Sequence, residues 1–393
     1  MKKLFLLVIA LISMHTYADQ LSNDFTISGF GRVVGGQLFK NDYQYNGYTN
    51  EFDFGQESLF SVQIDGKITD KISATGQLLL HASDSRRSGV EWAYLSYHHN
   101  DNLHFKLGKL RTPFFNYSDV MDVGFVYPWI NPPNQVYSEY VFSTFEGANV
   151  TYNVSLGDNN YFLEGYWGRF DDSVFVEGEE FNPKVKNLRG MVFNLERDNL
   201  SYRLSYHVAH VNSFQKGIDD LSQQLAGLGF AKSAKSLVSI GNVHAVQAGV
   251  SYHSLDYFAR AEWMRIDSDL LIFPETQGYY ATLGYNFTPF AVHFTFANHD
   301  SSFGESVQEI PLGIAPELNM LSAVYNSVFD YLSTSDVKSY TLGLRYDIQT
   351  NIALKADISW LEGCLPEEHR SVQPAADMYN QAAMLQLGVE WIF

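Results

Sequence analysis

The chain has 393 residues, of which 46% are hydrophobic, 15% aromatic and only 18% charged, and its formal net charge is −18. This acidic balance argues against nucleic acid as a partner, because binding to phosphates requires a basic surface. The length is large for one ordinary globular domain and normal for a barrel. The apolar residues do not form the long runs that membrane helices require, and the only continuous run is at the start of the chain.

The first residues have the order of a secretory signal. Lys2 and Lys3 precede the apolar run LFLLVIALI, and the small-residue segment SMHTYADQ follows it. The run has about nine residues, whereas a spanning helix needs roughly 20. We predict that residues 1–18 are a cleaved signal peptide, with a retained membrane helix as the alternative. Removing the two lysines takes the charge of the exported chain from −18 to −20.

After this start, segments of about ten residues repeat in which apolar and polar residues alternate. In SVQIDGKI, for example, Val62 and Ile64 fall on one face, and Gln63 and Asp65 fall on the other. A period of two predicts β-strands. The sixteen predicted strands are 24–34, 57–68, 70–81, 88–98, 102–110, 144–155, 159–169, 185–197, 199–210, 243–253, 255–266, 276–287, 289–299, 337–348, 350–361 and 380–393.

The connections between these strands alternate between short and long. Turns such as HHNDN, LGDNN and FTP alternate with the long segments 34–56, 111–143, 211–242, 300–336 and 362–379. A soluble sandwich also alternates apolar and polar residues, but this order of turns and loops is typical of an outer-membrane barrel. In lipid a sheet must close on itself. We therefore predict that residues 19–393 form one all-β domain, a transmembrane antiparallel up-and-down β-barrel of about 16 strands.

The last strand, QLGVEWIF, fits the closing position of such a barrel. Its apolar residues share one face, which we predict to be lipid-facing: Leu387, Val389, Trp391 and Phe393. Gln386 and Glu390 then face the lumen. An ordinary buried strand is the alternative.

The signal, the strand count, the order of turns and loops and the terminal Phe393 together resemble the sixteen-stranded porins of the Gram-negative outer membrane. The resemblance implies a water-filled channel for passive diffusion of small hydrophilic solutes and ions, without enzymatic activity or a cofactor. It also implies contact with outer-membrane lipid and lipopolysaccharide, reading of Phe393 by the barrel-assembly machinery, and a homotrimer. The lipid-facing small residues Gly29, Ala148 and Gly165 would permit close subunit packing.

The third long connection, LRTPFFNYSDVMDVGFVYPWINPPNQVYSEY, lies between the fifth and sixth strands. In the porins the loop at this position folds into the barrel and narrows it. Four prolines restrict its backbone and eight aromatic residues can pack it against the wall, so we expect a rigid insert. The Pro-Glu-Phe-Gly-like segment of the general porins is absent here, which leaves pore size and selectivity open.

Selectivity should depend on charges at the narrowest point. The candidates near the loop are Asp119, Asp122, Glu139 and Arg111. On the wall the basic candidates are Lys106, Arg203, Arg260, Arg345 and Lys355, and the acidic residues Asp65, Glu164, Glu262 and Asp357 lie at inward positions between them. Opposite charges across a constriction would favour small polar solutes; alternatively these residues are only a solvated wall, or Arg111 and Asp119 pin the loop by an ion pair. Tyr127, Trp129 and Tyr137 would either stack sugars or pack the loop base.

Two long loops carry a helical pattern. GIDDLSQQLAGLGF and APELNMLSAVYNSVFDYL predict short helices that cap the mouth, the second beginning at Pro316. The predicted apolar stripes are Ile218, Leu221, Leu225 and Leu228 in the first and Leu318, Leu321, Val324 and Val328 in the second. The helices either pack on one another or form a lid.

No catalytic or metal site is predicted. NHDSS brings His299, Asp300, Ser301 and Ser302 together in sequence only, and there is no G-x-S-x-G elbow. The twelve histidines are scattered, although calcium at the acidic stretch DDSVFVEGEE stays open. The single cysteine, Cys364, cannot form an internal disulfide and is expected in a loop. A sugar- or anion-selective channel and a receptor barrel remain the alternative functions.

Overall fold

The structure is a computed structural model that describes residues 24–393 except 84–85, 139–141, 173, 177–178, 182, 213–215, 305, 331–335 and 366–378. The predicted signal peptide, residues 1–18, and the candidate Glu139 lie outside the described residues.

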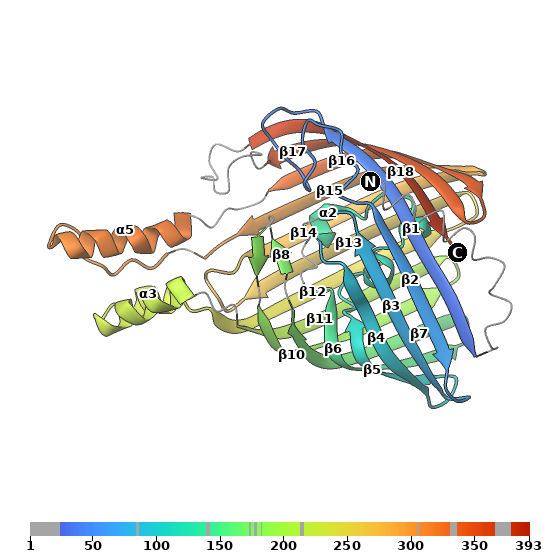
Figure 1. Cartoon of the computed structure of the whole chain (residues 1–393), viewed down its shortest axis with the longest axis horizontal. Helices are drawn as coiled ribbons and strands as arrows, with labels where there is room; N and C mark the ends of the chain where they lie inside the picture. The colour runs from blue at the N-terminus through green and yellow to red at the C-terminus, as the bar shows by residue number, and fades with distance from the viewer. Residues whose placement is uncertain are drawn as a thin grey trace.

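Sixteen antiparallel strands form one closed barrel in the described part of the chain, and a separate two-stranded sheet accompanies it (Figure 1). Each strand pairs with its neighbour along the sequence, and the last strand closes on the first, from Phe30 opposite Ile392 to Leu38 opposite Met384. Closure leaves no free sheet edge, as a membrane-spanning sheet requires. The predicted fold class is confirmed.

The strands are numbered in chain order, with β8 and β9 outside the barrel. They are β1 (Phe25–Leu38), β2 (Leu59–Lys67), β3 (Ile72–His81), β4 (Gly89–His98), β5 (Leu103–Arg111), β6 (Thr144–Leu156), β7 (Asn159–Asp171), β8 (Val174–Val176), β9 (Glu179–Phe181), β10 (Lys184–Arg197), β11 (Leu200–Asn212), β12 (Ile240–His253), β13 (Tyr257–Ser268), β14 (Glu275–Phe287), β15 (Phe290–Ser302), β16 (Val337–Gln349), β17 (Ile352–Cys364) and β18 (Tyr379–Ile392).

The predicted strand boundaries differ from the observed ones mainly at the end of the barrel that carries the long loops. There β1 continues to Leu38, β15 to Ser302 and β17 to Cys364. Pairing with a neighbour extends these strands through residues such as Gly35 and Gly36 that read as turn signals in the sequence. Cys364 therefore lies at the end of a strand and not in a loop, and it is a free, half-buried cysteine. The β8–β9 hairpin was not predicted.

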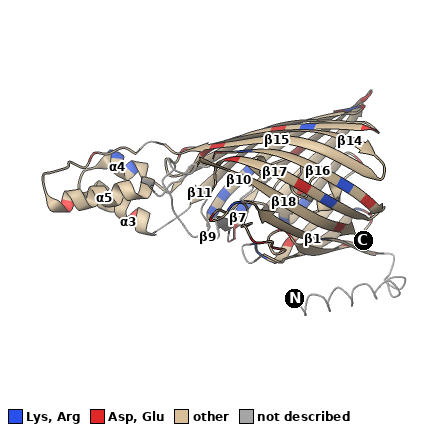
Figure 2. Cartoon of the chain, turned by 90° about the horizontal axis from the view of Figure 1, so that it is seen from above, with Lys and Arg blue, Asp and Glu red and all other residues tan. Residues whose placement is uncertain are grey.

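Side chains alternate between the two faces of the wall. On β15, Val292 and Phe294 are exposed outside, whereas His293 and Thr295 are buried inside. The interior carries charges of both signs: Lys355 and Asp357 of β17 and Glu390 of β18 are all buried. Figure 2 marks the basic and acidic positions along the strands. The alternation read from the sequence thus separates an apolar outer belt from a polar inner wall.

Aromatic rings gather on the outer belt near the short turns. Phe290 lies 4.8 Å from Tyr346 and 5.6 Å from Phe287 between ring centroids, and Tyr257 lies 5.0 Å from Tyr285. Such a row of rings is typical of the membrane–water interface of outer-membrane barrels.

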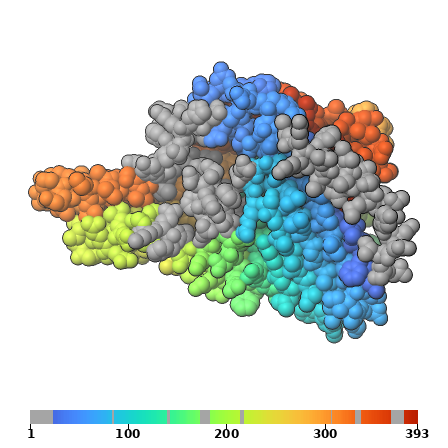
Figure 3. Space-filling model, in the orientation of Figure 1, coloured from blue at the N-terminus to red at the C-terminus, as the bar shows by residue number. Residues whose placement is uncertain are grey.

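Three helices project from the loop end of the barrel: α3 (Lys216–Gly227), α4 (Ala231–Ser236) and α5 (Pro316–Asp330). They pack on each other beyond the barrel wall and do not lie across its mouth (Figures 1 and 3). Their shared core includes Leu225, Leu237 and Tyr325, each fully buried. We call these helices the outer helical cluster. Within the described residues no helix is long and apolar enough to cross a membrane.

Two positions of the predicted stripes are wrong. Leu228 is 54% exposed because α3 ends at Gly227, so Leu228 lies in the following turn. Val324 is 48% exposed because the buried face of α5 runs through Leu321 and Tyr325, four residues apart, which turns Val324 to the edge.

Candidate channel constriction

The connection 112–143, between β5 and β6, packs against the inner wall. It contains two single 3₁₀ turns, Ser118–Val120 and Gly124–Val126, and the short helix α2 (Asn134–Tyr137). Its buried rings share one hydrophobic cluster with inward residues of several strands. The buried loop members of this cluster are Phe114, Phe115, Tyr127, Trp129, Val136, Tyr137 and Phe142, and wall members include Tyr166, Val211 and Tyr280.

The three aromatic candidates of the sequence are therefore buried. Tyr127 and Trp129 are 1% exposed and Tyr137 is 5% exposed. Trp129 donates its indole N–H to the Thr295 hydroxyl on β15 at 2.8 Å, and the Tyr137 hydroxyl donates to Glu262 on β13 at 2.9 Å. Trp129 and Tyr137 therefore attach the loop to β15 and β13.

Basic side chains of the wall hold the loop by its backbone. Lys355 Nζ donates to the carbonyls of Gly124 and Trp129 at 2.6 and 2.7 Å. Arg345 donates to Phe125 and Tyr127 carbonyls at 2.6 and 3.2 Å, and Arg32 donates to the Ile130 carbonyl at 3.1 Å. We call Arg32, Arg345 and Lys355 the carbonyl anchors.

Acidic side chains complete this attachment. Glu390 lies 2.6 Å from Lys355 Nζ, and Asp357 accepts the Ile130 backbone N–H at 2.9 Å. Both carboxylates are almost fully buried. A buried charge is tolerated only with such partners, so the loop and the wall stabilise each other.

Two further candidates sit at the entry of the loop. Arg111 pairs with Asp122 of the loop and, at 2.9 Å, with Glu91 of β4. Burial by itself would raise the pKa of Asp122, but the adjacent Arg111 guanidinium outweighs it and lowers that pKa to about 2. Asp122 therefore keeps its charge and its ion pair through mildly acidic conditions.

Arg260 of β13 is engaged with rings. Its guanidinium lies 5.4 Å from the centroid of the Tyr117 ring and 5.3 Å from that of Trp129, and it donates to His253 at 2.7 Å. This arrangement is a cation–π contact that supports the loop.

Three side chains of the loop stay exposed among the packed ones: Asn116, Asp119 and Val126. Glu164 of β7 lies within electrostatic reach of Asp119, Lys106 and Arg203. The structure thus brings three of the charged candidates together around one wall carboxylate, with both signs present. Arg203 also donates to the Pro113 carbonyl at 2.7 Å, whereas Lys106 lies over the Tyr94 ring at 5.2 Å.

The wall of β2 and β3 carries polar side chains that bond to each other. Gln63 donates to Asp65 at 2.8 Å, Thr75 donates to Asp65 at 2.6 Å, and Gln77 donates to Gln63 at 3.1 Å. Among the described residues none of these four side chains hydrogen-bonds to the connection 112–143. The polar groups of β2 and β3 thus bond to one another, whereas the loop is bonded to Arg32 of β1, Arg111 of β5 and side chains of several strands from β11 to β17.

Sequence reasoning missed Arg32 and Glu57. Arg32 donates to the Glu57 carboxylate at 2.7 Å and is 3% exposed. The alternation of β1 could have placed Arg32 inward. Its partners, however, come from segments 25 and 98 residues away, for which the sequence offers no signal.

The structure separates the neighbours of NHDSS. His299 faces inward and lies 3.1 Å from the Gln135 carbonyl, whereas Asp300 is exposed on the other face of β15. No group of three or more His, Cys, Asp or Glu side chains in the described part of the chain is arranged to hold a metal ion. The side chains of the acidic stretch 173–180 lie outside the described residues.

Comparison with known proteins shows the fold but no near relative. No family model and no curated protein matches the chain. Among solved structures it is similar to the outer-membrane channel DcaP of Acinetobacter baumannii and to OmpF of Salmonella typhi in complex with daunomycin, each at TM-score 0.56 and 12% identity, covering 94% of this chain and 97% of the other. It is also similar to an anion-selective porin from Comamonas acidovorans, at TM-score 0.54 and 12% identity, covering 94% and 99%. The chain has the porin-like barrel fold of these outer-membrane proteins.

Proposed function

We propose that the chain is an outer-membrane porin: a water-filled channel for passive diffusion of small hydrophilic solutes and ions. The observation that carries the proposal is that the connection 112–143 is bonded to inward side chains of β1, β5 and several strands from β11 to β17. Its Asp119 stays exposed and interacts electrostatically with Glu164 of the wall, as do Lys106 and Arg203. A narrow passage with charges of both signs suits small polar solutes.

The functions described for two of the similar structures agree with this proposal. They include an outer-membrane channel and an anion-selective porin. The carbonyl anchors also agree with an opening of fixed size, because they hold the backbone of the loop from several strands.

The proposal is tested by single-channel conductance and reversal potential in a planar bilayer under a salt gradient. We expect ohmic steps in the wild type. Asp119→Asn should shift the reversal potential toward anion preference and Lys106→Gln toward cation preference, because each removes one charge from the passage. Asp101→Asn, an exposed charge in the turn before β5, serves as the matched control and should leave the potential unchanged.

Absence of conductance steps from folded wild-type protein would contradict the channel proposal. Conductance with equal reversal potentials in all four proteins would leave the channel in place and remove Asp119 and Lys106 from its constriction. Deletion of residues 117–138 should enlarge the steps if the shortened barrel still folds.

We further propose that the protein assembles as a homotrimer in contact with lipopolysaccharide and that Phe393 is the signal for the barrel-assembly machinery. A Vibrio cholerae outer-membrane protein of similar fold, at 11% identity and TM-score 0.54, is described in a trimer form. Light scattering of the detergent-extracted protein would measure the subunit number, and a monomer would contradict this proposal.

A further inference from the structure

We infer that His98 of β4 and His104 of β5 form a binding site for a divalent transition-metal ion. The two residues lie directly opposite each other on neighbouring strands. Their Nδ1 atoms face each other at 2.6 Å, and their ring centroids lie 4.6 Å apart with the rings at 74°. Imidazole nitrogens suit Zn²⁺, Ni²⁺ and Cu²⁺, and among these ions Cu²⁺ binds a given site most tightly.

The turn between β4 and β5 fixes the register of this pair. The side-chain oxygen of Asn100 accepts the backbone N–H groups of Asn102 and Leu103, at 3.0 and 2.8 Å. An asparagine that bonds to the backbone two residues further on stabilises a tight turn. His98 and His104 therefore stay opposite each other, and the backbone needs no rearrangement for both rings to reach one ion.

His104 already has the tautomer of a metal ligand. Its Nε2 atom lies 3.2 Å from the Asp101 carbonyl oxygen, which can only accept, so the ring proton is on Nε2. The Nδ1 atom of His104 then carries a lone pair that points to His98. Ligating histidines commonly donate their second ring N–H to a carbonyl in this way, and that bond orients the ring.

The two nitrogens are close enough to share one ion. Two nitrogens that each lie about 2.0 Å from an ion are about 2.9–3.3 Å apart at right or tetrahedral angles. The observed 2.6 Å is a hydrogen bond between the rings, so it has to widen slightly. His98 is exposed and can turn by that amount. Without the ion His98 donates its Nδ1 proton to His104, and with the ion bound His98 carries this proton on Nε2.

The charges around the pair allow a cation to bind. Lys106, the next inward residue of β5, holds its ammonium group over the ring of Tyr94 at 5.2 Å, and Tyr94 lies four residues before His98 on β4. Asp101 in the turn and Lys71 in the neighbouring turn are both exposed, so water screens their charges. No third His, Cys, Asp or Glu side chain in the described part of the chain completes the pair, so water fills the other positions around the ion.

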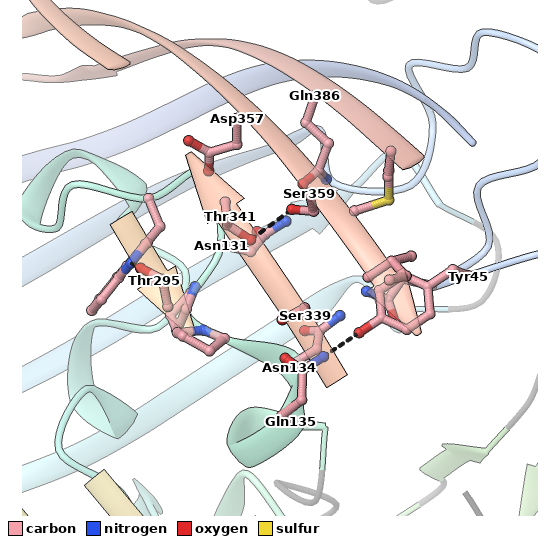
Figure 4. Close-up of a pocket in the computed structure, with 16 residues that line it drawn as sticks. Tyr45, Asn131, Asn134, Gln135, Thr295, Ser339, Thr341, Asp357, Ser359 and Gln386 are labelled. Atoms are coloured by element: carbon pink, nitrogen blue, oxygen red, sulfur yellow. Dashed lines mark hydrogen bonds between the residues drawn. The ribbon is translucent and has the colours of Figure 1, made fainter. Parts of the chain in front are cut away.

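Other histidines of the inner wall lie in packed surroundings. His293 lies 3.4 Å from Asp357, which lines a small pocket between the connection 112–143 and the β15–β18 wall (Figure 4). His293 is 3% exposed and His207 is 2% exposed. A hydrated ion would have to lose its water to reach either ring, which costs free energy. The exposed end of the barrel wall at the β4–β5 turn carries no such cost.

The test measures binding of CuCl₂ to the detergent-extracted protein, prepared without a histidine tag. Calorimetric titration gives the number of sites and the half-saturating Cu²⁺ concentration, and electron paramagnetic resonance reports the nitrogen ligands. We expect a site with two nitrogen ligands in the wild type. In His98→Ala and in His104→Ala the half-saturating concentration should rise at least about tenfold, because each variant removes one of the two protein ligands.

His99→Ala is the matched control. His99 follows His98 in the same turn, but its ring lies beside the exposed ring of Tyr97, at 6.2 Å between centroids. This variant should reproduce the wild-type titration. Gel mobility without heating checks that every variant is folded, and His98→Gln and His104→Gln replace an alanine variant that does not fold.

Three results would overturn the inference. These are a wild type that binds no Cu²⁺, a wild-type titration in either the His98 or the His104 variant, and an equal loss of binding in His99→Ala. None of these measurements uses conductance. A failure of the channel proposal would therefore leave this test unchanged, and a failure of this test would leave the channel proposal unchanged.

Discussion

Gly29 and Gly31 of β1 show how single residues shape the closing seam of the barrel. A side chain at Gly29 would meet the Phe393 ring, and one at Gly31 would meet Trp391. The Phe393 backbone N–H donates to the Gly29 carbonyl at 2.9 Å, and its ring stacks on Phe60 at 5.9 Å. The space beside Gly29, which the sequence suggested for subunit packing, is filled here by the chain's own terminal ring.

This geometry leads to a stability prediction. Gly31→Ala should lower the free energy of unfolding by about 1–3 kcal/mol, because the added methyl group collides with the Trp391 ring. Urea titration in detergent, followed by the mobility shift of the folded barrel on unheated gels, measures the change.

The matched control for this variant is Gly165→Ala on β7. A side chain at Gly165 meets only Val150, at 3.7 Å, which is ordinary contact. Its urea midpoint should stay near the wild-type value. Equal midpoints for the two alanine variants would show that Trp391 yields without cost and would contradict the packing argument.

At the scale of the element, the connection 112–143 is held in place by charged side chains of the barrel strands. The carbonyl anchors contact backbone oxygens, so the side chains of residues 124–130 are free to serve packing. Arg345 and Lys355 were placed inward by strand alternation. Their hydrogen bonds to this loop could not be predicted from the sequence, because the backbone carbonyls of every loop are equivalent acceptors.

A pair of variants tests the Lys355 anchor. Lys355→Met leaves Glu390 buried without its cation, which should lower stability by about 3–5 kcal/mol. The double variant Lys355→Met/Glu390→Leu removes both charges and should recover most of that loss. The same unheated-gel urea titration reports both values. A double variant less stable than the single one would show that the two residues do not act as a buried pair.

At the scale of the whole molecule, the outer helical cluster is a separate apolar core built on the barrel. Its buried residues come from two long loops, and they pack on each other rather than on the wall. The sequence predicted α3 and α5 from their periodicity. It did not predict α4 or the way in which the helices project beyond the barrel (Figure 1).

Because the outer helical cluster has its own core, we predict that the barrel folds without it. Replacing residues 316–330 by a short Gly/Ser linker should leave the barrel folded, since α5 packs in the outer cluster, but it uncovers Leu221 and Leu225 of α3. The truncated protein should therefore aggregate more in light scattering. Replacing residues 216–236 in the same protein should restore the monodisperse state, because the apolar face of α3 is then no longer present to be exposed. Loss of the folded-barrel gel mobility in either variant would contradict the independence of the two parts.

The sequence by itself determined the sixteen strands, their two faces and the closure of the last strand on the first. These follow from a period of two and from the order of short and long connections, both of which are local properties of the chain. The tertiary structure alone decided which candidate charges stay exposed and which hold the loop. Asp119 and Lys355 look alike as lumen candidates, yet Asp119 is exposed and Lys355 is buried against two carbonyls. Such contacts join residues more than two hundred positions apart, so no local pattern encodes them.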